Sequence, residues 1–194
     1  MSEETAAPVD VQSILTSDQT ERSVFVKFRE QVCFDSELRR TVEEFTVQLA
    51  DESSELAQSM NAGKVSLKRG IALWVLGKPE EAQAALGAAA STADSNFFLA
   101  LCELDMGRSA RALGYAEKVL SSDPSDDGAA LLAAEARIKA GDTEGGTALL
   151  DRLAKNEALM TEVEYLRGLS YDIAGEYDKA EETYQNSVER DPGA

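Results

Sequence analysis

Histidine is absent from this 194-residue sequence, and cysteine occurs only twice. The absence of histidine removes the side chain that most often acts as a general base and as a zinc ligand. The two cysteines, Cys33 and Cys102, lie far apart without CxxC spacing. This arrangement favours buried free thiols in a reducing compartment over a single disulfide.

Other signatures of enzymes are missing as well. The sequence has no Ser–His or Cys–His set, no glycine-rich phosphate loop and no metal-ligand spacing, so we expect no catalytic residue, no metal and no cofactor. Asp123, Asp126 and Asp127 share one predicted loop and offer oxygen ligands for calcium, but their spacing differs from that of an EF-hand. We expect these residues to shape the turn.

Basic residues are scarce: 19 Lys and Arg stand against 36 Asp and Glu, which gives a net charge of −17. A chain without a cationic surface does not attract nucleic acid or anionic lipid, so neither is an expected partner. The acidity predicts a solubilising surface, with attraction to a basic partner as the alternative.

Long apolar runs are missing too. No stretch of 18 apolar residues and no N-terminal signal-peptide pattern occurs, which predicts a cytoplasmic protein that does not insert into membranes. The periplasm stays open as a location, because a chain from which a signal peptide or anchor had been removed would look the same.

The residues that are present favour closely packed helices. Hydrophobic residues make up 43% of the chain, but aromatic residues only 6%, and alanine supplies much of the rest. Alanine favours helices, whereas a β-sandwich draws on β-branched and aromatic residues. The sequence therefore predicts an all-α fold.

The first third of the chain shows helical segments without a repeat. Residues 1–8 predict a disordered acidic tail, and residues 9–62 a helical region. In this region we expect a helix that begins with Ser36 as its N-cap and a further helix that stops at Asn61. The apolar residues that would face a core are Phe25, Phe28, Leu38, Val42 and Phe45.

Four glycines then recur at intervals of 30, 34 and 34 residues, each between two helix-like stretches: Gly77, Gly107, Gly141 and Gly175. A small residue lies seven positions before and five positions after each of them. We expect each glycine to end a first helix in the left-handed conformation, and Pro79 to lie in the first turn of the helix that follows. The small residues allow two helices to cross closely.

This pattern resembles the tetratricopeptide repeat, which has small residues at positions 8, 20 and 27, aromatic residues at 11 and 24, and Pro at 32. Residues 161–194 match it best, and the other three units are 63–92, 93–126 and 127–160. The matching residues of the last unit are Gly168, Tyr171, Gly175, Tyr177, Ala180, Tyr184 and Pro192. The resemblance implies about four tandem hairpins in a right-handed superhelix, an α-solenoid, over residues 63–194, preceded by the N-terminal helical segment.

The two middle units depart from the family pattern. Glu103 and Arg137 occupy position 11, where the family has an aromatic residue. This predicts looser packing there, or an ion pair between Glu103 and Arg137 in adjacent units. In contrast, we expect Tyr177 and Tyr184 to pack within their hairpin rather than to form a ligand cage.

In the family, the first helices of the hairpins line a concave surface. The apolar side chains that fall on this surface here predict a partner-binding groove: Leu67, Ile71, Trp74, Phe97, Leu101, Leu131, Tyr165 and Leu169. Some family members grip a terminal carboxylate with cationic side chains, but the matching positions here hold Leu67, Ile71, Phe98 and Leu132. Without cations, that mode of binding is excluded.

The groove predicts a non-enzymatic scaffold or adaptor that binds a helix or peptide of a protein partner. Three alternatives stay open. The chain's own helices from residues 9–60 would fill the groove, or the chain would form a homodimer or larger assembly through it. The third is a chaperone similar to the translocator chaperones of type III secretion, which the tract of residues 95–99 resembles, although the near-ideal fourth repeat departs from their pattern.

Overall fold

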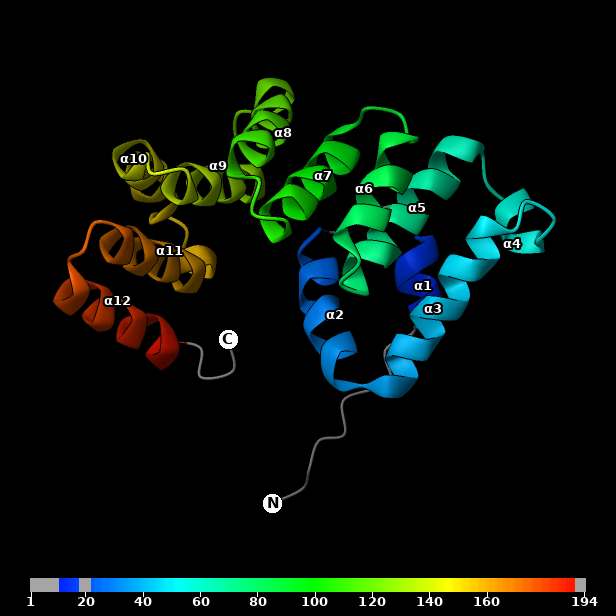
Figure 1. Cartoon of the computed structure of the whole chain (residues 1–194), viewed down its shortest axis with the longest axis horizontal. Coiled ribbons are helices and arrows are strands. Elements are labelled where there is room, and N and C mark those ends of the chain that lie inside the picture. The colour runs from blue at the N-terminus through cyan, green and yellow to red at the C-terminus, as the bar shows by residue number, and fades with distance from the viewer. Residues whose placement is uncertain (1–10, 18–21, 191–194) are drawn as a thin grey trace, which may run out of the picture. The chain divides into compact units, whose positions relative to one another are not determined.

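The computed structural model describes residues 11–17 and 22–190, and every regular element in these residues is helical. It comprises twelve α-helices and one 3-10 helix (Figure 1). The predicted all-α fold is confirmed, and the predicted tail, residues 1–8, lies outside the described residues. The chain divides into two compact units, residues 1–90 and 91–194.

The first unit holds four N-terminal helices and one hairpin. Helices α2 and α3 both pack against α5, and this packing joins the N-terminal helices to the hairpin α5–α6. The helices are α1 (Val11–Thr16), α2 (Arg22–Phe34), α3 (Ser36–Ala50), α4 (Glu55–Gln58), α5 (Ala62–Val75) and α6 (Pro79–Gly87). The hairpin α5–α6 therefore belongs to the first unit.

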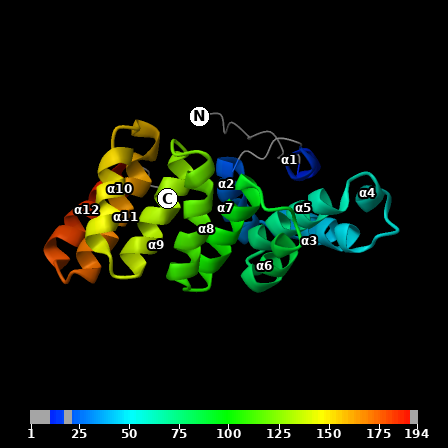
Figure 2. The same cartoon turned by 90° about the horizontal axis from the view of Figure 1, so that it is seen from above.

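The second unit is a stack of three hairpins. Its helices lie side by side and alternate in direction (Figure 2). They are α7 (Ala93–Asp105), α8 (Ser109–Ser122), α9 (Asp127–Lys139), α10 (Thr143–Leu153), the 3-10 helix η1 (Glu157–Leu159), α11 (Met160–Ile173) and α12 (Tyr177–Arg190). Each second helix packs against the first helix of the next hairpin, α8 against α9 and α10 against α11.

Two predicted helix boundaries in the first unit are wrong. The N-cap of α3 is Asp35, whose carboxylate accepts hydrogen bonds from the backbone N–H groups of Glu37 at 2.9 Å and Leu38 at 3.0 Å. A carboxylate accepts both bonds at once, which the hydroxyl of Ser36 does less well. Asn61 begins α5 instead of ending a helix, because its side chain accepts from the N–H of Lys64 at 2.8 Å.

The four spaced glycines end the first helices of the four hairpins. Their φ angles are 72° at Gly77, 70° at Gly107, 89° at Gly141 and 78° at Gly175, and no other described residue has a positive φ. The same pair of backbone hydrogen bonds follows at each glycine. At Gly141, for example, its N–H donates to Ile138 and that of Asp142 donates to Arg137, both at 2.9 Å. These bonds satisfy carbonyls that the helix leaves unpaired, so each glycine both ends a helix and reverses the chain.

The two helices of a hairpin approach closely where the small residues lie. A Cβ atom added to Gly168 would lie 2.6 Å from the ring of Tyr184, and one added to Gly70 would lie 2.5 Å from Leu86. At these two crossings, glycine leaves room for the large side chain at position 24 of the opposite helix. In the second hairpin, position 24 is the small Ala116, and Ala100 fits opposite it.

The predicted ion pair between Glu103 and Arg137 does not form. Glu103 is fully buried, and Arg108 and Arg111, from the start of the next helix, lie 3.7 Å and 3.6 Å from its carboxylate. Glu103 thus has counter-charges within its own hairpin, so its carboxylate is not buried without one. Arg137 pairs with Asp142 of its own hairpin and with Glu117 of the preceding one.

The cysteines differ from the prediction in one respect. Neither forms a disulfide, and Cys102 is buried, but Cys33 is exposed. The buried side of α2 carries Phe25, Phe28 and Val32 at helical spacing. Cys33 is one residue past this stripe and is therefore rotated by about 100° away from the core.

The left-handed turns make a clear prediction. Replacing Gly141 by Ala is expected to destabilise the protein by about 1 kcal/mol, because alanine pays a steric cost at positive φ even though no other atom lies within 4 Å. The matched control is Gly114→Ala in the middle of α8, where the added Cβ also meets nothing within 4 Å. It is expected to stabilise the protein by up to about 1 kcal/mol. Urea unfolding measures both, and equal signs for the two variants would contradict the prediction.

The close helix crossing makes a second prediction. Gly168→Ala is expected to destabilise the protein by about 1–2 kcal/mol, because the new methyl group displaces the ring of Tyr184. In a Tyr184→Ala background the same change is expected to cost little, since the pair then matches Ala100 and Ala116. A double-mutant cycle of unfolding free energies measures the coupling. Additive effects would show that the two residues do not constrain each other.

Candidate functional site

The part of the predicted groove that falls in the first unit is not an open surface. Trp74 and Ile71 of α5 are buried, with 2% and 0% of their surfaces exposed, and Leu67 is half-buried. The guanidinium of Arg29 on α2 lies over the ring of Trp74, 4.5 Å from its centre. The N-terminal helices thus pack over this side of α5, and Trp74 and Ile71 are core residues instead of contact residues.

Phe97 in the second unit is also buried, which corrects its prediction as a groove residue. Its ring stacks edge-on against Phe98 with centroids 5.6 Å apart. It also lies so close to α9 that a Cβ on Gly128 would be 3.2 Å away from it. The glycine leaves room for the ring, so Phe97 fills the space between α7 and α9. The whole tract of residues 95–99 is buried in α7.

The remaining predicted residues of the second unit reach solvent. Leu101, Leu131 and Leu169 are half-buried, and Tyr165 is 51% exposed. Leu131 and Leu169 pack against the edge of the core that α9, α10 and α11 form. These four side chains belong to α7, α9 and α11, the first helices of three successive hairpins, of which α9 packs against both α7 and α11. They are the part of the predicted strip that a partner can reach.

A second apolar surface shares Tyr165 with the predicted strip, but its other residues were not predicted as a site. Four of the seven large apolar side chains that are exposed in the described residues lie on α11 and α12: Tyr165, Ile173, Tyr177 and Val188. Tyr177 is 69% exposed, so the prediction that it packs within its hairpin is wrong. Its place at the very start of α12 leaves it beyond the helix crossing.

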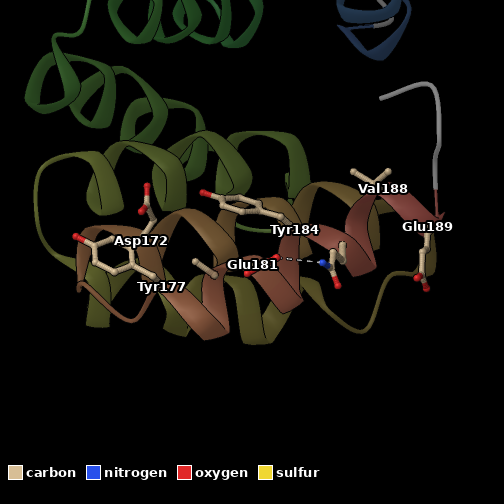
Figure 3. Close-up of a pocket in the computed structure, with 8 residues that line it drawn as sticks. Asp172, Tyr177, Glu181, Tyr184, Val188 and Glu189 are labelled. Atoms are coloured by element: carbon tan, nitrogen blue, oxygen red, sulfur yellow. Dashed lines mark hydrogen bonds between the residues drawn. The ribbon is translucent and has the colours of Figure 1, made fainter.

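Two cavities hollow this surface. The first has a volume of about 610 Å³ and runs along α12 (Figure 3), lined by Asp172, Tyr177, Ala180, Glu181, Tyr184, Gln185, Val188 and Glu189. The second, of about 680 Å³, is lined by Thr161, Glu162, Tyr165, Tyr184, Ser187 and Val188. Tyr184 and Val188 line both cavities, which makes them one continuous surface. We call the residues that line the two cavities the α11–α12 face.

Tyr184 lies at the centre of the α11–α12 face. Its ring covers Gly168 and lies 5.7 Å from that of Tyr165, while its hydroxyl points toward the Asp172 side of the first cavity (Figure 3). Burial raises the pKa of Tyr184 above its ordinary value of 10.0, and the nearby Asp172 and Tyr165 raise it further. The phenol is therefore neutral at physiological pH and presents a hydrogen-bond donor next to apolar carbon.

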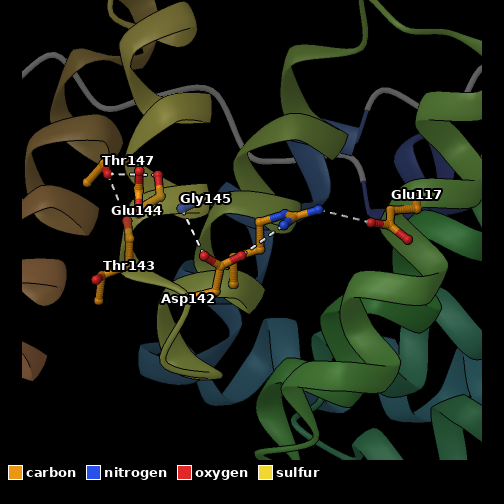
Figure 4. Close-up of polar contacts among 7 residues, drawn as sticks. Glu117, Asp142, Thr143, Glu144, Gly145 and Thr147 are labelled. Atoms are coloured by element: carbon orange, nitrogen blue, oxygen red, sulfur yellow. Dashed lines mark hydrogen bonds and ion pairs between the residues drawn. The ribbon is translucent and has the colours of Figure 1, made fainter.

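The junction between the second and third hairpins includes a polar cluster. Arg137 of α9 binds Glu117 of α8 at 3.2 Å and Asp142 at 2.9 Å (Figure 4). Asp142 is also the N-cap of α10, since its carboxylate accepts from the N–H of Gly145 at 2.9 Å. The hydrogen bond from Gly145 and the one from Arg137 lower the pKa of Asp142 below its ordinary value of 3.8.

The three aspartates of the loop after α8 each accept hydrogen bonds that hold this loop or the start of the next helix. Asp126 is the N-cap of α9 and accepts from the N–H of Ala129 at 2.8 Å, while Asp123 accepts from Ser125. Asp127 accepts from Asn156 at 3.1 Å. Within residues 11–17 and 22–190, no group of three or more Cys, Asp or Glu residues is placed to hold a metal ion. None of the helices in these described residues could span a lipid bilayer.

These features define a class of protein, the helical-hairpin repeat proteins, in which stacked hairpins present a surface to a partner. Sequence models described as Tetratricopeptide repeat match residues 67–130, 103–168 and 163–193. The chain belongs to the tetratricopeptide repeat family. No curated protein matches it in a sequence search.

Solved structures with the same fold include two of MamA and one of YrrB. MamA 41-end from Desulfovibrio magneticus RS-1 is 22% identical with a TM-score of 0.57, over 69% of this chain and 77% of that one. The structure named MamA MSR-1 C2 is 17% identical with a TM-score of 0.60, over 87% and 97%. YrrB, described as a TPR protein with an unusual peptide-binding site, is 18% identical with a TM-score of 0.58, over 87% and 86%. At these identities the similarity shows the fold alone.

The lowered pKa of Asp142 predicts how stability depends on pH. A carboxyl group whose pKa is lower in the folded than in the unfolded protein stabilises the fold at pH values above its unfolded-state pKa. This stabilisation is lost as the pH falls through its folded-state pKa. Asp142→Ala is therefore expected to be less stable than the parent at pH 7, with a difference that narrows below about pH 4. Thermal unfolding across this range measures it. Asp142→Asn is the control, since it keeps a cap but has no proton to bind, and a pH-independent difference between it and the parent would contradict the assignment.

Proposed function

We propose that this protein is a non-enzymatic scaffold or adaptor that binds a helix or extended segment of a protein partner on the second unit. The observation that carries the proposal is the row of solvent-reaching apolar side chains on α7, α9 and α11: Leu101, Leu131, Tyr165 and Leu169. Successive hairpins present these residues along one array, which suits an elongated partner.

The energetics of burial support this choice. An apolar side chain that a partner covers contributes about 25 cal/mol for each Å² removed from water, and a few well-packed residues dominate most interfaces. Leu131 and Leu169 already rest on the core, so they lose little freedom when a partner binds. A preformed row of apolar side chains of this kind favours a peptide over a large flat partner.

Membership of the tetratricopeptide repeat family also supports a binding role, because these repeats are typically interaction modules without catalysis. YrrB, which shares the fold, is described as having a peptide-binding site. The α5 side of the first unit is left out of the proposed groove, since α2 and α3 pack against it and Trp74 is buried.

Replacing Leu131 by Glu is expected to lower capture of the partner by the tagged full-length chain at least about tenfold, because the carboxylate must be desolvated at the interface. Leu101→Gln is a second, milder variant on α7. Val47→Glu on α3 is the matched control, since Val47 is 68% exposed and lies in the first unit. Quantitative mass spectrometry of proteins captured from the source cell provides the measurement, and circular dichroism confirms that each variant is folded. Undiminished capture by both folded groove variants would rule out this groove.

A further inference from the structure

The α11–α12 face combines apolar side chains with negative charge. Among its twelve lining residues are four carboxylates and no Lys or Arg: Glu162, Asp172, Glu181 and Glu189. None of these carboxylates forms an ion pair within the described part of the chain. The three cations of α11 and α12 are engaged elsewhere, Arg167 with Asp151, Lys179 with Glu176, and Arg190 with Glu164.

The same face is covered in the preceding hairpins. Counting from the first residue of each repeat unit, position 28 is Leu120, Ala154 and Val188 in the three units of residues 93–194. Leu120 and Ala154 pack against the core formed by α9, α10 and α11, whereas Val188 is 58% exposed. The α11–α12 face is thus the stacking surface of the hairpin array, and the described residues provide no helix to cover it.

The covered faces show what kind of helix stacks there. At both junctions within the second unit, an arginine of the incoming first helix binds an acidic residue at position 25 of the preceding second helix. Arg137 binds Glu117 at 3.2 Å, and Arg167 binds Asp151 at 2.7 Å (Figure 4 shows the first of these). The incoming helix is therefore amphipathic, with an apolar stripe toward the core and a cation beside it.

The last hairpin differs at this acidic position. Position 25 is Gln185, but Glu181 and Glu189 lie one helical turn before and after it on the same side of α12 (Figure 3). The Gln185 amide donates a long hydrogen bond to Glu181, at 3.5 Å. Two carboxylates in place of one favour a helix with more than one cation.

We propose that the α11–α12 face binds a basic amphipathic helix of a protein partner, which stacks on α12 as α9 stacks on α8. The proposal rests on the function of the second unit as a protein-binding array, and it adds a second contact surface with a stated partner chemistry. The first cavity extends from Tyr177 to Glu189, which are 12 residues apart on one helix. This distance is about 18 Å, so the occupant has about three helical turns.

Charge opposes two other occupants, a second copy of the chain and residues 1–10. A symmetric homodimer through this face would bring its four carboxylates against their own copies, which opposes association. Residues 1–10 contain Glu3, Glu4 and Asp10 but no Lys or Arg, so this segment would meet the same repulsion. A basic helix from another protein satisfies both the apolar and the charged part of the face.

The probe for this proposal is a synthetic helical peptide of about 14 residues with leucines at i, i+4 and i+7 and arginines beside them. The control peptide carries Glu in place of every Arg. Fluorescence anisotropy with the full-length chain is expected to show micromolar binding of the Arg peptide and at least about tenfold weaker binding of the Glu peptide. Added salt is expected to weaken the binding of the Arg peptide but not that of the Glu peptide.

Variants of the exposed residues locate the binding. Val188→Asp and the pair Glu181→Lys/Glu189→Lys are each expected to weaken the Arg peptide about tenfold or more. Glu182→Lys is the matched control, because Glu182 is exposed on α12 but lines neither cavity, and it is expected to change the affinity less than about twofold. All of these positions are exposed, and circular dichroism confirms folding.

The possible outcomes separate this proposal from the groove on α7, α9 and α11. Equal binding of the Arg and Glu peptides, or unchanged affinity in the Val188 and Glu181/Glu189 variants, overturns the basic-helix site. If Leu131→Glu abolishes capture of the partner while the α12 variants have no effect, the groove stands and the α11–α12 site fails. Light scattering that shows a dimer of the parent and a monomer of Val188→Asp would assign the face to a second copy of the chain and also overturn the proposal.

Discussion

The left-handed turn at the end of each first helix is the constraint on which the rest of this structure depends. Gly77, Gly107, Gly141 and Gly175 adopt φ angles of 70–89° and reverse the chain through the same pair of backbone hydrogen bonds. A residue with a Cβ would resist this conformation, so the turns occur only at glycine. In each hairpin the second helix begins the same number of residues after the glycine. The turn therefore also determines which side chains meet at the helix crossing.

The register that the turns impose extends to the surfaces between hairpins. It places an acidic residue of α8 and α10 beside an arginine of the helix that follows, as with Glu117 and Arg137. It also places Leu120, Ala154 and Val188 at one position of successive units, of which only Val188 is widely exposed. The stacking of hairpins and the proposed binding of a partner helix therefore use the same geometry.

Much of the second unit could be predicted because its signals are local. The spacing of glycines, the small residues at the crossing and the apolar periodicity each depend on neighbours within one hairpin. The candidate site was harder to predict. Trp74 and Phe97 occupy positions that line a groove in the family, yet both are buried, Trp74 beneath Arg29 of α2 and Phe97 against Gly128. The predicted start of α3 is also wrong, because Asp35 and Ser36 are both suitable capping residues.

The sequence by itself determined that the chain is all-helical, where the hairpins reverse and which family it belongs to, because these properties follow from backbone preferences and from a periodic pattern of small and apolar residues. The tertiary structure decided which apolar residues are exposed. That outcome depends on what packs over each helix: α2 and α3 against α5 in the first unit, and no described helix over Tyr177 and Val188 in the second. Solvent exposure is a property of neighbours distant in the sequence, and a single helix does not encode it.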